Sequence, residues 1–165
     1  HYIDKKVHKS LLDEMLLAAN LAPSWKNSQT PRFYVATGEK SKNAVREALP
    51  EFNRKNSENA SAYIVTTVVL NRSGFDKDGT AVTEIGNGWG YYDLGLNNMA
   101  LLLKATELGI STLVMGIRDG EKLRKEFDIP DTEAVVSVIA VGYTDSEIVR
   151  PKRKSVEDFA KFYED

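Results

Sequence analysis

The sequence predicts a domain in which α-helices and β-strands alternate along the chain. With 165 residues the chain has the length of one domain with a substantial hydrophobic core, so we expect a single domain over 1–165. Apolar residues recur at helical spacing in 10–21 and 89–108, whereas 62–70 is a run rich in β-branched residues. No Gly-x-Gly-x-x-Gly sequence directly follows a predicted strand, so a Rossmann-type dinucleotide fold is not expected.

The first predicted helix occupies 10–21. Its apolar side chains recur three and four residues apart, and Ser10 with Asp13 fits a capping box at its start. Pro23 ends this helix, because proline has no N–H to donate and disfavours helical geometry in the residue before it.

The remaining elements follow from the same two patterns. A long segment with five glycines, 71–90, separates the two halves of the chain and is typical of a functional lid or a disordered loop. The Asn-rich stretch 53–59 fits neither pattern. We expect strands at 32–37, 62–70, 111–117 and 134–143, helices at 40–49, 89–108 and 120–127, and a last helix after the capping-box pattern 155–158.

A polar loop lies between the first helix and the first strand. Its sequence is Pro23-Ser24-Trp25-Lys26-Asn27-Ser28-Gln29, which offers hydroxyl, amide and backbone N–H groups to a polar ligand. The order Pro-Ser-x-x-Asn-x-Gln after an Ala-rich helix end resembles the flavin-binding loop of the nitroreductase family, the FMN-dependent NAD(P)H oxidoreductases.

The resemblance extends over nearly the whole chain. The opening segment 2–7 looks like the lead into the family's first helix, and 93–101 is similar to its central helix. The Gly116-Ile117 pair and the basic cluster 152–154 occupy the places of the family's remaining flavin contacts. The family's Arg-x-Ser phosphate-binding motif would precede Tyr2 and is not part of this sequence, so we expect that segment to be missing.

The resemblance implies both a fold and an activity. The fold would be α+β, with a mixed, mainly antiparallel sheet flanked by helices, and the protein would be a homodimer with FMN at the interface. NADH or NADPH would reduce the flavin, which would then reduce a nitro compound, a quinone or a similar small-molecule acceptor. No side chain would be catalytic, because the cofactor carries the chemistry. The cofactor-binding residues implied are Pro23, Ser24, Asn27, Gln29, Asn53, Met115, Gly116, Lys152 and Lys154.

Other interpretations remain open at this point. Gly116 also fits a tight structural turn, and Lys152 with Lys154 also fits a solvated run of charge. Trp25 and Trp89 could stack on a ligand ring or belong to the core or to a dimer interface. The protein could instead bind flavin without reductase turnover, dehalogenate a substrate, degrade flavin, or be an interaction module without a cofactor.

Composition excludes several classes of function. The net charge of −2 gives no general attraction for nucleic acid, and the absence of cysteine excludes disulfides, Fe–S ligation and a cysteine nucleophile. The two histidines, His1 and His8, have no metal-ligand partner at suitable spacing, so no metal site is expected. No apolar run is long enough to cross a membrane, and a cytoplasmic location is expected.

Overall fold

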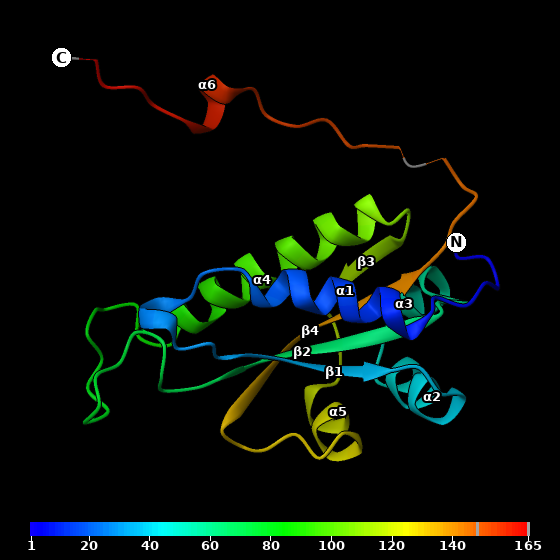
Figure 1. Ribbon diagram of the computed structural model, residues 1–165, viewed down its shortest axis with the longest axis horizontal. Coiled ribbons are helices and arrows are strands. Elements are labelled where there is room, and N and C mark those ends of the chain that lie inside the picture. The colour runs from blue at the N-terminus through cyan, green and yellow to red at the C-terminus, as the bar shows by residue number, and fades with distance from the viewer. Residues whose placement is uncertain (148, 165) are drawn as a thin grey trace.

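Four strands form one antiparallel sheet in this computed structural model, which describes residues 1–147 and 149–164 (Figure 1). The spatial order is β1-β2-β4-β3, so β2 and β4 are central and β1 and β3 are the edges. Every pair in this order is antiparallel, as expected for the α+β class. The strands are β1 (Pro31–Ala36), β2 (Ala62–Val69), β3 (Ser111–Met115) and β4 (Glu133–Gly142).

Helices cover both faces of the sheet (Figure 1). The long helix α4 (Gly88–Glu107) packs with α1 (Lys9–Asn20) on one face. On the other face lie α2 (Glu39–Glu47) and α5 (Gly120–Glu126), and α2 leads into the short helix α3 (Glu51–Asn56). No helix in the described part of the chain is long and apolar enough to span a membrane.

The alternation of side chains along β2 divides the core into two halves. Ile64 belongs to the half formed with α1 and α4, where it joins Leu101. Its neighbour Val65 points to the opposite face and belongs to the half formed with α2 and α5, where it joins Leu123. All four side chains are fully buried, which explains why the sequence of this strand is apolar on both faces.

Most predicted elements are confirmed to within one or two residues, but the cap of the first helix was wrong. The helix begins at Lys9, its N-cap is His8, and no side chain caps it. Ser10 therefore lies inside the first turn, two residues after the N-cap position. Asp13 forms an i,i+4 ion pair instead, with Lys9 Nζ at 2.7 Å.

The segment between β2 and α4 is irregular but internally bonded. Asn71 and Asn87 close it at its base, with the Asn71 N–H donating to Asn87 Oδ1 at 2.7 Å and Asn87 Nδ2 donating to Asn71 Oδ1 at 2.9 Å. Where it enters α4, a Cβ added to Gly90 would lie 2.9 Å from Val68 Cγ2. Gly90 therefore allows α4 to approach β2 closely.

The chain beyond β4 leaves the body of the fold (Figure 1). Within its described residues it carries one short helix, α6 (Val156–Phe159), with the predicted capping box between Ser155 and Asp158. Phe159 and Phe162 are 70% and 75% exposed. The tail therefore presents aromatic side chains that its own subunit does not cover.

Candidate functional site

The polar loop after α1 has a strained conformation. Its centre is the short 3₁₀ turn η1 (Trp25–Asn27). Lys26, Asn27 and Gln29 have left-handed φ angles of 45°, 54° and 47°, which bring Cβ close to the following carbonyl oxygen in any residue but glycine. The Gln29 N–H donates to Ser24 Oγ at 3.0 Å and closes the loop. Such conformations persist only where the surroundings hold them, and they cluster at ligand sites.

The residues of this loop with predicted flavin contacts are accessible. Pro23, Asn27 and Gln29 are exposed and Ser24 is half-buried. In the described part of the chain Asn27 bonds through its backbone N–H, to the Ser24 carbonyl at 3.0 Å, while its side-chain amide has no partner. The amide is therefore available to a ligand.

Aromatic side chains hold one flank of the loop against α4. The ring centroids of Trp25 and Trp89 are 4.7 Å apart at an interplanar angle of 47°, and Tyr92 meets Trp89 edge-on at 5.8 Å. The Trp89 indole N–H donates to Thr83 Oγ1 at 2.8 Å. Both indoles therefore have packing partners within this chain, while the Tyr92 side chain remains 59% exposed.

A second group of predicted site residues gathers where the edge strand β3 ends. Met115, the last residue of β3, is buried, and Gly116 after it is exposed. The Asn53 side chain of α3 donates from Nδ2 to the Ile117 carbonyl at 3.1 Å. The structure thus brings Asn53 to Ile117, the residue directly after Gly116, although the two are far apart in sequence.

Nothing within the fold of the chain requires a glycine at position 116. Its φ is not in the left-handed region, and a Cβ added to it would meet nothing within 4 Å. Gly142 is the opposite case, since its Cβ would lie 2.6 Å from Tyr2 Cδ1. A tight structural turn therefore does not explain Gly116. The open, exposed backbone beside the Asn53 amide fits close approach by a planar polar ring such as that of a flavin.

The two groups lie apart within one subunit. Figure 1 places η1 beside the N-terminal end of α4, whereas α3 lies toward the other end of the sheet, near the start of the chain. Lys152 and Lys154 belong to neither group, because they are exposed in the tail that leaves the fold after β4. One subunit therefore presents the predicted contacts as three separate sets.

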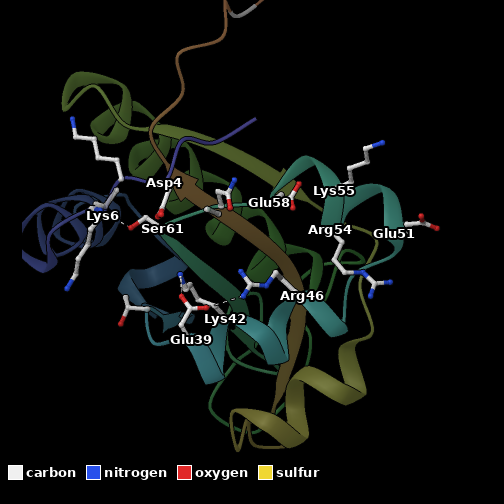
Figure 2. Close-up of a pocket in the computed structure, with 15 residues that line it drawn as sticks. Asp4, Lys6, Glu39, Lys42, Arg46, Glu51, Arg54, Lys55, Glu58 and Ser61 are labelled. Atoms are coloured by element: carbon white, nitrogen blue, oxygen red, sulfur yellow. Dashed lines mark hydrogen bonds and ion pairs between the residues drawn. The ribbon is translucent and has the colours of Figure 1, made fainter.

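A large hollow of about 890 Å³ is distinct from all three sets (Figure 2). It lies between the N-terminal segment, α2 and α3, and its walls are mainly charged. Glu39 bonds there with Lys42 at 2.6 Å, and the lysine beside it holds the pKa of that carboxyl below its usual value. Lys55 of α3 lines this hollow, whereas Asn53 of the same helix does not. None of the predicted cofactor contacts lines it.

A smaller pocket of about 420 Å³ borders the polar loop. Ser24 and Gln29 line it, together with Arg32, Arg72 and Asn97, which sequence reasoning did not select. Arg32 donates to the Gln29 carbonyl at 2.7 Å. The available signal was the closeness of Arg32 in the sequence, three residues after the last residue of the polar loop, Gln29.

The residues of these sets offer mainly hydrogen-bonding groups. Within the described residues, no cluster of His, Asp or Glu side chains could hold a metal ion. Amide, hydroxyl and backbone groups dominate both the polar loop and the end of β3. This is the donor set expected of a protein that binds and orients a cofactor which supplies the chemistry.

Comparison with known families identifies the class of protein. The family model described as Nitroreductase family matches residues 1–143, and the chain belongs to this family. Among curated proteins no match was found.

Solved structures show the same fold. A nitroreductase family protein from Streptococcus pneumoniae TIGR4 is 22% identical, with a TM-score of 0.83 over 99% of this chain and 94% of the other. A nitroreductase family protein from Clostridium difficile 630 is 23% identical, with a TM-score of 0.78 over 98% and 90% of the two chains. A protein described as an FMN-dependent nitroreductase, from Clostridium difficile R20291, is 26% identical with a TM-score of 0.70 over 96% and 87%.

Proposed function

We propose that this protein is an FMN-dependent oxidoreductase that passes electrons from NADH or NADPH to a nitro compound, a quinone or a similar acceptor. When bound, FMN supplies the redox chemistry by accepting hydride at N5 and releasing electrons to the acceptor. The family assignment supports this activity, and so do the amide, hydroxyl and backbone groups of the polar loop and of the segment around Gly116.

The observation that carries the proposal is Gly116. Neither backbone conformation nor crowding within the chain requires glycine there, yet its absent side chain leaves the backbone open beside the Asn53 amide. We assign Asn53, Met115 and Gly116 to the ring of the flavin, since an amide and backbone N–H groups suit its polar edge. Pro23, Ser24, Asn27 and Gln29 would contribute the second wall, and Lys152 and Lys154 would meet the phosphate.

A homodimer would bring these separate sets together. The exposed side of α4 carries an apolar stripe of Tyr92, Met99 and Leu103, which are 59%, 51% and 58% exposed. These residues are spaced seven and four positions apart, so they lie on one side of the helix. A stripe of this kind on a 20-residue helix, together with an aromatic tail, suits burial against a second copy of the chain.

The test uses the purified protein. We expect an oxidised-flavin absorption spectrum, release of FMN on denaturation as identified by chromatography, and oxidation of NADH or NADPH that depends on a quinone or nitroaromatic acceptor. Recovery of FAD alone would contradict the cofactor assignment. Bound FMN without nicotinamide oxidation would identify a flavin-binding protein without turnover, and a colourless protein that ignores added FMN would indicate an interaction module.

A further inference from the structure

A buried carboxylate lies directly behind the polar loop. Asp93, in the second turn of α4, is only 2% exposed. Its two oxygens both lie 3.1 Å from the backbone nitrogen of Trp25, and Oδ2 is 2.5 Å from Ser73 Oγ. Among the described residues no cation pairs with it, so the Trp25 N–H and the Ser73 hydroxyl are the groups that compensate its burial.

The carboxylate also determines which hydroxyl groups donate in a small network of hydrogen bonds. Ser73 Oγ lies 2.6 Å from Ser28 Oγ and 3.2 Å from Thr30 Oγ1. Ser73 donates its single hydroxyl proton to Asp93 Oδ2. Ser28 and Thr30 must then donate to Ser73. The polar loop is thereby hydrogen-bonded near both of its ends to α4 through the Asp93 side chain, directly at Trp25 and by way of Ser73 at Ser28.

This arrangement matters because the loop between these two hydrogen-bonded positions is strained. Lys26, Asn27 and Gln29 all have left-handed φ angles without being glycine. Such residues relax to ordinary conformations unless fixed groups on either side hold them. The hydrogen bond at Trp25 immediately precedes the strained residues, and the hydrogen bond at Ser28 lies among them.

We propose that Asp93 is a positioning residue, which holds the loop around Asn27 in the conformation that binds FMN. The proposal rests on the proposed function for the ligand itself. Asp93 does not touch the ligand in this scheme. It acts through the Trp25 N–H and through Ser73, and its removal lowers affinity by letting the loop relax.

The loop carries its own spectroscopic reporter. The chain has two tryptophans, Trp25 and Trp89, and their rings are 4.7 Å apart. Tryptophan near-UV circular dichroism and fluorescence of the apo-protein therefore report whether the loop is seated on α4. This readout needs neither FMN nor activity.

The experiment compares three variants with the wild type. Asp93→Ala should change the tryptophan signal of the apo-protein and raise the FMN Kd at least tenfold. Asp93→Asn keeps an acceptor for Trp25 N–H, and Ser73 can turn its proton to Ser28, so it should recover most of the affinity. Ser73→Ala, a smaller change than Asp93→Ala, should raise the Kd severalfold and keeps the test decisive if Asp93→Ala does not fold.

The matched control is Ser137→Ala. Ser137 is also a buried serine, 6% exposed, and bonds to another hydroxyl, that of Thr66 at 2.7 Å, but it lies in β4. It should lower the unfolding midpoint while leaving the tryptophan signal and the FMN Kd unchanged. If Ser73→Ala behaves like Ser137→Ala in all three measurements, the positioning role is wrong.

A failure of the proposed function is distinguishable from a failure of this inference. If the wild type does not bind FMN, the proposed function is wrong. The apo tryptophan signal of Asp93→Ala then still decides whether Asp93 holds the loop. An unchanged signal and unchanged FMN Kd in a folded Asp93→Ala protein would overturn the inference alone.

Discussion

The Asn53 side chain donates a hydrogen bond to the Ile117 carbonyl at 3.1 Å, across 64 positions of sequence. This bond joins α3 to the segment that leaves the edge strand β3. It fixes the backbone at Ile117, directly after Gly116, and leaves the glycine itself uncovered. A polar amide and an open backbone therefore meet at one point, although neither element would mark a site alone.

Gly116→Ala separates a ligand role from a structural role. The added Cβ meets nothing within 4 Å and φ is not left-handed, so the free energy of unfolding of the apo-protein should change by no more than about 0.5 kcal/mol. The FMN Kd should rise at least tenfold, or about 1.4 kcal/mol, because the methyl group occupies the space left for the ring. Fluorescence titration and apo denaturation measure the two quantities.

Gly90→Ala provides the contrasting control. Its Cβ would lie 2.9 Å from Val68 Cγ2 in the packed contact between α4 and β2, so it should destabilise the fold by about 1–3 kcal/mol. Gly116→Ala with unchanged FMN affinity would remove the glycine from the site.

Tyr34→Phe tests a partly buried polar contact in the sheet. The Tyr34 hydroxyl donates to Glu133 Oε2 at 3.0 Å, and Glu133 is only 6% exposed. A hydrogen bond to a charged group contributes about 1.5–3 kcal/mol, so the variant should lose a free energy of unfolding toward the lower end of that range at pH 8. The measurement is urea denaturation, with Tyr143→Phe as a control on a tyrosine whose hydroxyl has no partner in the described chain.

The same contact predicts a dependence on alkaline pH. Desolvation and the hydrogen bond to Glu133 raise the pKa of Tyr34 above its usual value of 10.0. A raised pKa means that the stabilisation is complete below the pKa of the unfolded chain and is lost as pH rises through the folded pKa. The difference between wild type and Tyr34→Phe should therefore shrink above about pH 10. A difference that stays constant up to pH 11 would contradict this assignment.

The sequence was sufficient for the elements of the fold because their signals are local. Apolar spacing located α4, and β-branched residues located β2, each within a residue or two. The predicted cap of α1 was wrong although Ser10 and Asp13 have the spacing of a capping box. The helix already begins at Lys9, and Asp13 pairs with Lys9 instead. The short α3 escaped prediction because six polar-rich residues show no periodicity.

The site was only partly predictable, because its contacts join distant parts of the chain. The bond from Trp25 to Asp93 spans 68 positions, and that from Ser73 to Asp93 spans 20. An aspartate in an apolar helix is visible in the sequence, but nothing local says which loop it holds. The left-handed φ angles at Lys26 and Gln29 could not be predicted either, since neither residue type favours them.

Met99→Lys tests whether the exposed side of α4 is a dimer interface. A lysine in the middle of the apolar stripe would place a charge in a buried interface, so light scattering at micromolar concentration should show a monomer in place of a dimer. Far-UV circular dichroism should be unchanged, because Met99 is 51% exposed in the subunit. FMN binding should fall together with dimerisation, since each subunit holds only part of the predicted contacts.

A charge change outside the stripe provides the control for that experiment. Lys125→Glu lies on the exposed surface of α5 and should leave the mass and the FMN affinity unaltered. A wild-type protein that is monomeric with FMN bound would rule out the shared site.

Asn27 calls for a pair of substitutions, because its backbone conformation matters as well as its amide. With φ at 54°, Asn27→Ala would remove the amide and also place a disfavoured residue in the left-handed region, at a cost of about 1–2 kcal/mol. Asn27→Gly removes the amide without that strain. If the amide binds FMN, Asn27→Gly should weaken binding by roughly 1 kcal/mol. The unfolding midpoint of the apo-protein should change little.

Asn27→Ala should then show both effects: the same loss of affinity and a lower apo stability. If the residue serves only to hold the left-handed turn, Asn27→Gly should bind FMN as well as the wild type, while Asn27→Ala alone is impaired. Fluorescence quenching by FMN, measured beside apo denaturation for both variants, distinguishes the two roles. Since the amide has no partner among the described residues, we expect the first pattern.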